Sequence, residues 1–136
     1  MKIKLLRKEN FKKLPERQHS MDAGADVYIN ERVVIPAHTT VAIPLGYGLE
    51  IPNGYMAMVI PRSGCAKKGI ITQIPPIDAG YTGNIHAITS NLTNEDYIIK
   101  EGDRIGQLVI IPVIIADFVD DMGEERGDNK FNSTGE

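Results

Sequence analysis

Short runs of apolar and β-branched residues, separated by turn residues, dominate the hydrophobic pattern of this 136-residue chain. Each of the following runs is rich enough in β-branched or aromatic residues to predict a β-strand: residues 33–35, 39–43, 47–51, 55–60, 85–89, 97–99 and 105–111. Helical periodicity is confined to a turn or two around Cys65–Lys68, closed by Gly69.

Turn signals fall between these runs. Pro52-Asn53-Gly54 predicts a hairpin, because Asn-Gly tolerates the positive φ angles of tight turns. Residues 100–103 predict another turn. Eight prolines and thirteen glycines spread along the chain suit many short strands better than a few helices. The pattern therefore predicts an all-β fold: a jelly-roll-like distorted β-barrel of short strands, with one short helix and a flexible C-terminal tail.

The C-terminus differs in character from the rest. Residues 120–136 are acidic and nearly free of apolar residues, with Phe131 as the lone aromatic. Such a composition is typical of a disordered tail. The alternative is a segment that orders over a ligand, with Phe131 as a lid and hydroxyl donors at Ser133 and Thr134. We therefore predict a domain over residues 1–119 and a lid segment over residues 120–136.

Composition limits the class of protein. The net charge of −3 argues against a nucleic-acid binder with a broad basic surface. Cys65 is the single cysteine, which excludes an internal disulfide. The longest apolar stretch, residues 108–116, contains Pro112 and is too short to span a bilayer. The first residues lack a secretory apolar segment, so we expect a cytoplasmic protein without membrane or nucleic-acid partners.

Three loops carry residues suited to chemistry. Residues 77–83, Ile-Asp-Ala-Gly-Tyr-Thr-Gly, place a carboxylate and an aromatic ring in one tight turn. We expect Asp78 to be buried and to face the same pocket as Tyr81. Residues 61–64 and 132–135 add serine, threonine and glycine in two further loops. Together the loops predict a site for a phosphorylated small molecule.

Five segments, in order, resemble the motifs of the trimeric dUTP diphosphatase (dUTPase) family, and the resemblance spans most of the chain. Five ordered motifs at sensible spacing are a specific signal, whereas any one alone is weak. The segments are Ala23–Val27, Pro61–Gly64 with Lys68-Gly69, Ile77–Gly83, Gly102–Leu108 and Arg126–Gly135.

The resemblance implies a reaction in which water attacks the α-phosphorus of dUTP and releases dUMP and pyrophosphate. Asp78 would be the general base that orients this water. On its own, without the other motifs, Asp78 is better interpreted as a turn-capping aspartate. Tyr81 would pack beneath the deoxyribose and exclude a ribose 2′-hydroxyl, although a core tyrosine is the alternative.

The resemblance also implies a binding site for the phosphate chain. Ser63 and Gly64 would bind phosphate at the start of the short helix, and Gln107 would reach an α-phosphate oxygen. Arg62 would contact phosphate or hold the site together through an ion pair with Asp26. Asp103 and Arg104 would support the site, or form a solvated turn pair.

From the C-terminal motif, Arg126 would meet the γ-phosphate, and Phe131 would stack on the uracil when the tail closes. Mg²⁺ is the implied cofactor, bound to triphosphate oxygens and water rather than to a protein cage. The scattered His19 and His38 look like ordinary loop residues. The family resemblance further implies a homotrimer whose active sites are shared between subunits.

Two departures from the family pattern concern base recognition and the lid. Pro75 and Pro76 replace residues of a hairpin that reads uracil through its backbone, and they remove two N–H donors. We expect the side chain of Gln73, with backbone groups near His86, to compensate. In the last motif, Lys130 and Asn132 stand where glycines are usual.

Other functions stay open at this point. A dCTP deaminase of related fold would use similar phosphate-binding loops. A regulatory protein that binds dUTP as a signal would use the same pocket. A jelly-roll module without a ligand is the least compatible with five ordered motifs.

Overall fold

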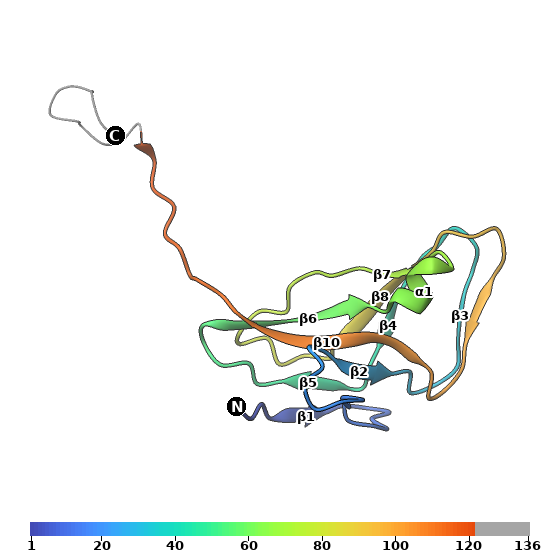
Figure 1. Ribbon diagram of the computed structural model, residues 1–136, viewed down its shortest axis with the longest axis horizontal. Coiled ribbons are helices and arrows are strands. Elements are labelled where there is room, and N and C mark those ends of the chain that lie inside the picture. Colours follow the sequence, from blue (N-terminus) through green and yellow to red (C-terminus); the bar gives the residue numbers. More distant parts are fainter. Residues whose placement is uncertain (122–136) are drawn as a thin grey trace, which may run out of the picture.

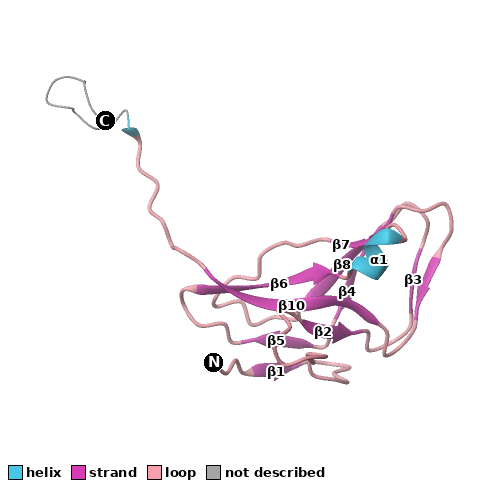
Figure 2. Cartoon of the chain, viewed as in Figure 1, coloured by secondary structure: helices cyan, strands magenta, loops and turns pink. Residues whose placement is uncertain are grey.

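The computed structural model describes residues 1–121, which form short strands and a single short helix (Figures 1 and 2). In chain order the elements are β1 (Leu5–Arg7), β2 (Ala25–Tyr28), β3 (Val33–Ile35), β4 (Thr40–Pro44), β5 (Tyr47–Leu49), β6 (Tyr55–Pro61), α1 (Ser63–Lys67), β7 (Ile70–Thr72), β8 (His86–Asn91), β9 (Tyr97–Ile99) and β10 (Arg104–Pro112).

The strands pair into four small antiparallel sheets. Their orders are β1-β5, β2-β10-β6, β3-β9 and β4-β8-β7. Neighbouring strands in a sheet are mostly distant in sequence, as when β10 lies between β2 and β6. This arrangement confirms the predicted all-β, jelly-roll-like class.

Every predicted strand overlaps an observed one, but β1, β2 and β7 were not predicted. The three are only three or four residues long. The helix was predicted, and Gly69 follows it with φ of +84°, a conformation in which glycine carries no steric penalty.

The hairpin predicted at Pro52–Gly54 is wrong, although a turn is present. The N–H of Tyr55 donates to the carbonyl of Pro52 (3.2 Å), and Gly54 has φ of +88°. However, β5 pairs with β1, and β6 pairs with β10. The turn thus passes the chain from one sheet to another. The other predicted turn is present, since the N–H of Asp103 donates to the carbonyl of Lys100 (3.0 Å).

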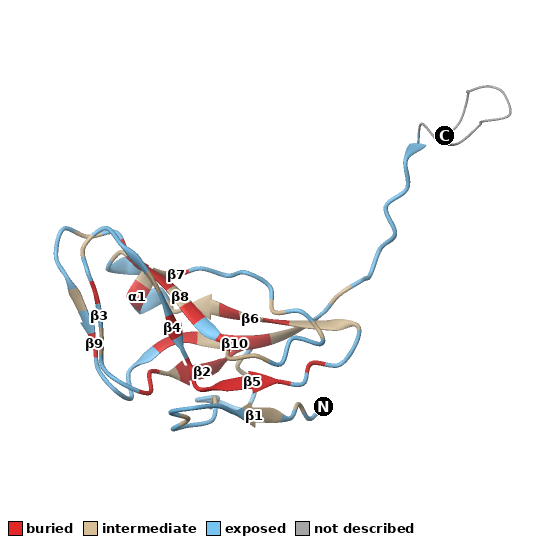
Figure 3. Cartoon of the chain, turned by 180° about the vertical axis from the view of Figure 1, so that it is seen from behind, coloured by how far each residue is buried: buried red, intermediate tan, exposed pale blue. Residues whose placement is uncertain are grey.

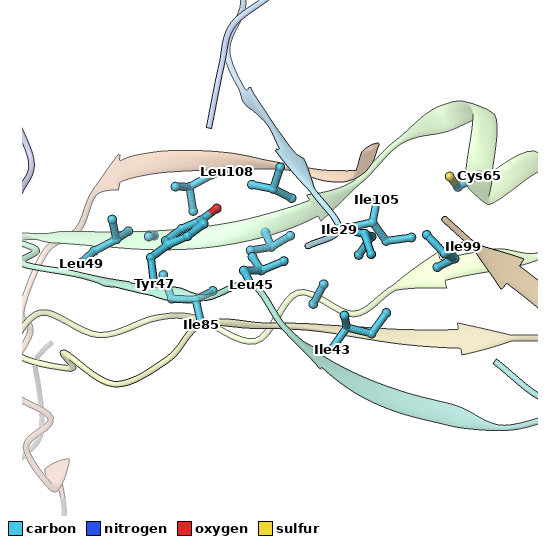
Figure 4. Packing of buried hydrophobic residues seen from close by; sticks show 14 of the residues in the cluster. Ile29, Ile43, Leu45, Tyr47, Leu49, Cys65, Ile85, Ile99, Ile105 and Leu108 are labelled. Carbon is cyan, nitrogen blue, oxygen red and sulfur yellow. The ribbon is translucent and has the colours of Figure 1, made fainter. Parts of the chain in front are cut away.

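One hydrophobic core lies between the sheets (Figure 4). At one end the ring of Tyr47 packs with Leu49, Ile85 and Leu108, and the core continues to Ile99 at the other end. Burying one such side chain contributes about 1.5–3 kcal/mol. Buried residues therefore follow the inner faces of the sheets, as Figure 3 shows in red.

Beyond β10 the chain leaves this core. The N–H of Val113 still donates to the carbonyl of Gly54 (2.9 Å). The segment that follows, residues 114–121, extends away from the domain and is exposed (Figures 1 and 3). Ile114 and Phe118 are 92% and 96% exposed. We call residues 114–121 the arm.

Candidate active site

The sheet β2-β10-β6 gathers polar residues of three motifs on its outer face. Gln107 of β10 lies opposite Asp26 of β2 and opposite Ile60 of β6. Because side chains alternate along a strand, Gly24 and Arg62, two residues away from these partners, belong to the same face. Residues from three distant segments are thus brought together on one surface, as the motifs predicted.

A β-bulge brings Arg104 onto this face. Gln107 and Gly106 lie opposite Asp26 and Val27, but Arg104 lies opposite Tyr28, so Ile105 is an extra residue. A one-residue shift exchanges the two faces of a strand. Arg104 therefore shares the face of Asp26, while Ile105 stays in the core at 1% exposure.

The carboxylate of Asp26 is the centre of this group. It is only 2% exposed. Its Oδ2 lies 3.3 Å from Nη1 of Arg104, and its Oδ1 accepts a hydrogen bond from Nε2 of Gln107 (3.4 Å). The predicted partner, Arg62, is more distant, with Nε 4.0 Å from Oδ1. A buried carboxylate needs such partners, because leaving it unpaired costs several kcal/mol.

Asp103 and Arg104 do not form the solvated turn pair that was one of the alternatives. Arg104 pairs with Asp26, as described above. Asp103 instead caps its own turn, because its Oδ2 accepts a hydrogen bond from the N–H of Lys100 (2.9 Å). The two neighbours therefore serve different local structures.

Ser63 and Gly64 begin α1 directly after β6. The first helical hydrogen bonds run from the N–H groups of Cys65 and Ala66 to the carbonyl of Arg62 (3.1 and 3.0 Å). The N–H groups of Ser63 and Gly64 precede these bonds, so helix geometry leaves them without an intrahelical acceptor. Both residues are exposed, and their donors are accessible to an anion.

A hollow of about 450 Å³ lies between α1 and the start of β10. Arg62, Lys68 and Arg104 line it, together with Gly64 and Asp103. Three cationic side chains from separate segments make this hollow suited to an anion. Lys68 was noted only as part of a motif, and its place beside the two arginines depends on tertiary structure.

The turn that carries Asp78 is anchored to β6. Ile77 and Ala57 exchange two backbone hydrogen bonds (2.8 and 3.0 Å), and the N–H of Tyr81 donates to the carbonyl of Asp78 (3.1 Å). Gly80 has φ of +91°. The expectation that Asp78 is buried is wrong, because the turn lies on the surface and presents the side chain to solvent.

Within residues 1–121, Asp78 and Tyr81 line two different hollows and not the single pocket expected for them. Asp78 borders a hollow of about 700 Å³ with Tyr55 and Ile115. Tyr81 borders another of about 150 Å³. Pro76 lines both, which makes the two hollows neighbours.

The smaller hollow brings together the residues predicted to read the base. Gln73, Tyr81 and His86 line it. The backbone N–H of Gln73 donates a hydrogen bond to the carbonyl of Ile88 (2.7 Å), and the side-chain Nε2 of Gln73 donates to Oγ of Ser90 (3.0 Å). Pro75 and Pro76 also line this hollow and bring no N–H donor to it.

Two further residues shape the site and were not singled out from the sequence. The carbonyl of Asn84 accepts a hydrogen bond from the hydroxyl of Tyr81 (3.0 Å). Gly24 leaves room for Gln107, because a Cβ at position 24 would lie 2.7 Å from Cβ of Gln107. Neither role has a signal in the linear sequence beyond its place within or beside a motif.

Asp78 and Arg62 lie near opposite ends of β6. Asp78 follows Ile77, which pairs with Ala57, so it lies near Met56. Arg62 follows the other end of the strand. Six residue steps separate positions 56 and 62, which is roughly 20 Å at about 3.3 Å per step. Within one chain the carboxylate is thus far from Arg62, and Gln107, opposite Ile60, is nearer, at four steps or roughly 13 Å.

Four predicted residues lie outside the described part of the chain: Arg126, Phe131, Ser133 and Thr134. Within residues 1–121, no three His, Cys, Asp or Glu side chains are grouped in a way that could hold a metal ion. His19 lies 3.2 Å from Asp22, and His38 lies 2.7 Å from Asn94, both on the surface. No helix in the described range is long and apolar enough to cross a membrane.

Comparison with known proteins decides the family. The dUTPase family model matches residues 10–135. The chain belongs to the dUTPase family. A deoxyuridine 5′-triphosphate nucleotidohydrolase of Ehrlichia canis is 42% identical over 132 residues, covering 90% of this chain and 86% of the relative.

Solved dUTPase structures share the fold. A mutant dUTPase of Staphylococcus bacteriophage 80alpha, solved with dUpNHpp, has a TM-score of 0.80 and 29% identity, covering 98% of this chain and 99% of that one. A mutant dUTPase from phage phi11 of S. aureus, described with a structural Mg(II) ion, has a TM-score of 0.78 and 28% identity, covering 88% and 96%.

Membership of the dUTPase family makes the chain an enzyme of the dUTP nucleotidohydrolase class, a hydrolase of nucleotide metabolism. The enzyme class predicted from the five motifs is therefore confirmed, in preference to a dCTP deaminase. The roles of individual residues are a separate question, which the geometry of the site addresses.

Proposed function

We propose that the enzyme cleaves dUTP to dUMP and pyrophosphate, with Asp78 as the general base that activates water for attack at the α-phosphorus. The observation that carries this proposal is the state of the Asp78 carboxylate. It is exposed on a turn fixed by backbone hydrogen bonds, and no hydrogen bond or ion pair engages it within residues 1–121. A carboxylate that is positioned but unused is available to accept a proton from water.

The triphosphate would bind to the outer face of β2-β10-β6 and the adjoining start of α1. Gln107 offers an amide donor, and Ser63 and Gly64 offer N–H groups. Arg62 and Arg104 add positive charge while pairing with Asp26. Donors and charges placed before the substrate arrives stabilise developing negative charge without further reorganisation. From the sequence, Arg126, Ser133 and Thr134 would add contacts from the tail.

The nucleoside would bind at the hollow beside Tyr81. The ring of Tyr81 would lie under the deoxyribose and leave no room for a 2′-hydroxyl. Gln73 and His86 border the same hollow and would contact the uracil edge. Phe131 would stack on the base as residues 120–136 close over the substrate and exclude water.

Mg²⁺ would neutralise charge on the triphosphate and orient its oxygens. The described residues fit an ion carried by the substrate: they offer cations rather than grouped carboxylates around the phosphate hollow. Mg²⁺ retains water readily, so phosphate oxygens and water can supply its ligands. The side chains would act on the phosphates and leave the metal to the substrate.

We further propose that the active site is completed by other copies of the chain, in a homotrimer. Along β6, Asp78 lies roughly 13 Å from Gln107 and roughly 20 Å from Arg62, a wide separation for residues that would act on one α-phosphate. The exposed apolar arm also favours assembly, because large apolar side chains such as Ile114 and Phe118 rarely stay exposed together. Hydrolysis of a free nucleotide is compatible with the cytoplasmic location expected from the sequence.

Product analysis tests the proposal. Purified protein with Mg²⁺ should release pyrophosphate from dUTP, and hardly any from dTTP, dCTP or UTP. Ammonia release from dCTP would indicate a deaminase. Tight binding of dUTP without pyrophosphate release would indicate a regulatory nucleotide sensor instead.

Deletion of residues 126–136 tests the lid. The shortened chain should keep its unfolding temperature, because the deletion lies beyond the core described above, yet lose most of its turnover. Full activity in the shortened chain would exclude the lid.

A further inference from the structure

The carboxylate of Asp26 is buried and lies beside two arginines and one amide, all of them candidates for binding phosphate. An ionised carboxylate only accepts hydrogen bonds, whereas the glutamine amide has one oxygen acceptor and two N–H donors. The contact between Asp26 and Gln107 therefore has one permitted orientation, with the nitrogen of the amide toward the carboxylate.

This orientation determines what Gln107 offers to a ligand. One N–H points at Oδ1 of Asp26. The amide oxygen lies on the side of Gly24, since a Cβ built there would be 2.9 Å from Oε1. The second N–H finds no acceptor among residues 1–121 and is left for the substrate.

The environment of Asp26 keeps this arrangement in place. The bulge at Ile105 puts Arg104 on the same face, so the carboxylate keeps a cationic partner at 3.3 Å. The backbone of Asp26 is also held, because it exchanges two hydrogen bonds with Glu16 (2.8 and 3.0 Å). Gly24 also contributes to this arrangement, because the absence of a side chain at position 24 leaves room for Cβ of Gln107.

We propose that Asp26 is a positioning residue for the reaction: it fixes the amide of Gln107 so that one N–H donor faces the α-phosphate. The inference rests on the proposed function, because it requires Gln107 to contact the triphosphate. It goes further in assigning Asp26 a role in turnover through a single named neighbour.

A double-mutant cycle with Asp26→Asn and Gln107→Ala tests this role through kcat/KM for dUTP. Gln107→Ala should lower kcat/KM roughly tenfold to a hundredfold, the range for one hydrogen bond to a charged group. Asp26→Asn should cause a fall of about tenfold in the wild-type background. In the Gln107→Ala background it should change kcat/KM by less than about twofold, because its effect passes through the missing amide.

Additive losses would overturn the positioning role, since a merely structural defect would lower activity with or without Gln107. Unchanged kcat/KM in Gln107→Ala would instead refute the phosphate contact of the proposed function. Asp22→Asn is the matched control, because it makes the same chemical change at the loop contact with His19, away from this face.

A second measurement reads the contact without activity. The side-chain amide signals of Gln107 in a ¹H–¹⁵N spectrum, assigned by their loss in Gln107→Ala, should shift in Asp26→Asn. Gly24→Ala, which keeps the carboxylate, should shift them too, because its Cβ would come within 2.7 Å of Cβ of Gln107. Signals unmoved in both variants would overturn the proposal, and the rest of each spectrum reports whether the variant is folded.

Discussion

The ring of Tyr81 lies directly against Gly83: a Cβ at position 83 would be 2.6 Å from the phenol oxygen and 2.8 Å from Cζ. The hydroxyl of the same ring donates to the carbonyl of Asn84. The turn thus fixes the ring through a hydrogen bond to Asn84, and Gly83 leaves the space that the ring occupies. The position of the proposed sugar-binding ring therefore depends on a neighbouring glycine.

Gly83→Ala should displace this ring and weaken the discrimination between dUTP and UTP. Tyr81 is 47% exposed, so the ring can swing outward and the unfolding temperature should change little. The ratio of kcat/KM for dUTP over UTP should fall by about tenfold, the scale of one small group in a pocket. Tyr81→Phe is the control, because it keeps the ring and loses only the hydrogen bond. A ratio unchanged in Gly83→Ala would show that the ring does not exclude the 2′-hydroxyl.

Asp78→Asn should separate turnover from both binding and stability. The side chain has no partner within the described residues, so unfolding free energy should change by no more than about 0.5 kcal/mol. Loss of a positioned base should lower kcat by roughly 10²- to 10⁴-fold. Calorimetric titration with a non-hydrolysable dUTP analogue should give nearly wild-type affinity. A matching loss of affinity would assign the carboxylate to binding instead.

Tyr47→Phe should stabilise the fold by about 1 kcal/mol, because a buried polar group without a partner carries a desolvation cost. Within residues 1–121, the hydroxyl of Tyr47 is the one buried side-chain polar atom without a hydrogen-bond partner. Thermal unfolding at neutral pH measures the change. Tyr97→Phe, at a partly buried position, is the control and should not stabilise.

The stability of the wild-type protein should depend on pH through Tyr47, because burial raises the pKa of its hydroxyl above the ordinary value. The folded state then binds the proton more strongly than the unfolded state does. Stability is fully present below the unfolded pKa, roughly 10, and is lost as pH rises above it. The unfolding temperature of wild type should fall more steeply than that of Tyr47→Phe above this pH. Parallel curves would contradict the shift.

The sequence predicted most strands and the family, because both depend on local patterns. β6 and β10 are long, contain β-branched or aromatic residues and occur where expected. β1, Leu5-Leu6-Arg7, has three residues and none that is β-branched or aromatic, so its pairing partner rather than local pattern decides its conformation. For the same reason the turn at Pro52–Gly54 was predictable, but the partners of the strands beside it were not.

Contacts within the site depend on register, which the sequence does not reveal. That Arg104, rather than Arg62, is nearer to Asp26 follows from the bulge at Ile105. The exposure of Asp78 and its separation from Arg62 follow from the pairing of Ile77 with Ala57. Motifs therefore proposed the candidate residues, and tertiary pairing determined which of them meet within one chain.

Two impaired variants should restore activity when their chains are mixed. If Asp78 and Gln107 of one active site come from different copies, a site between an Asp78→Asn chain and a Gln107→Ala chain can contain both native residues. Random exchange in an equal mixture should make about a quarter of the sites complete, since each residue is native in half of the copies. The mixture, unfolded and refolded together, should thus regain about a quarter of wild-type pyrophosphate release, whereas each variant refolded separately keeps only its own low residual activity. No recovery, in assemblies shown by mass to contain both chains, would place both residues in the site of a single copy. The roughly 13 Å that four steps of β6 put between Asp78 and Gln107 would then have to be closed by a rearrangement of the turn at Asp78.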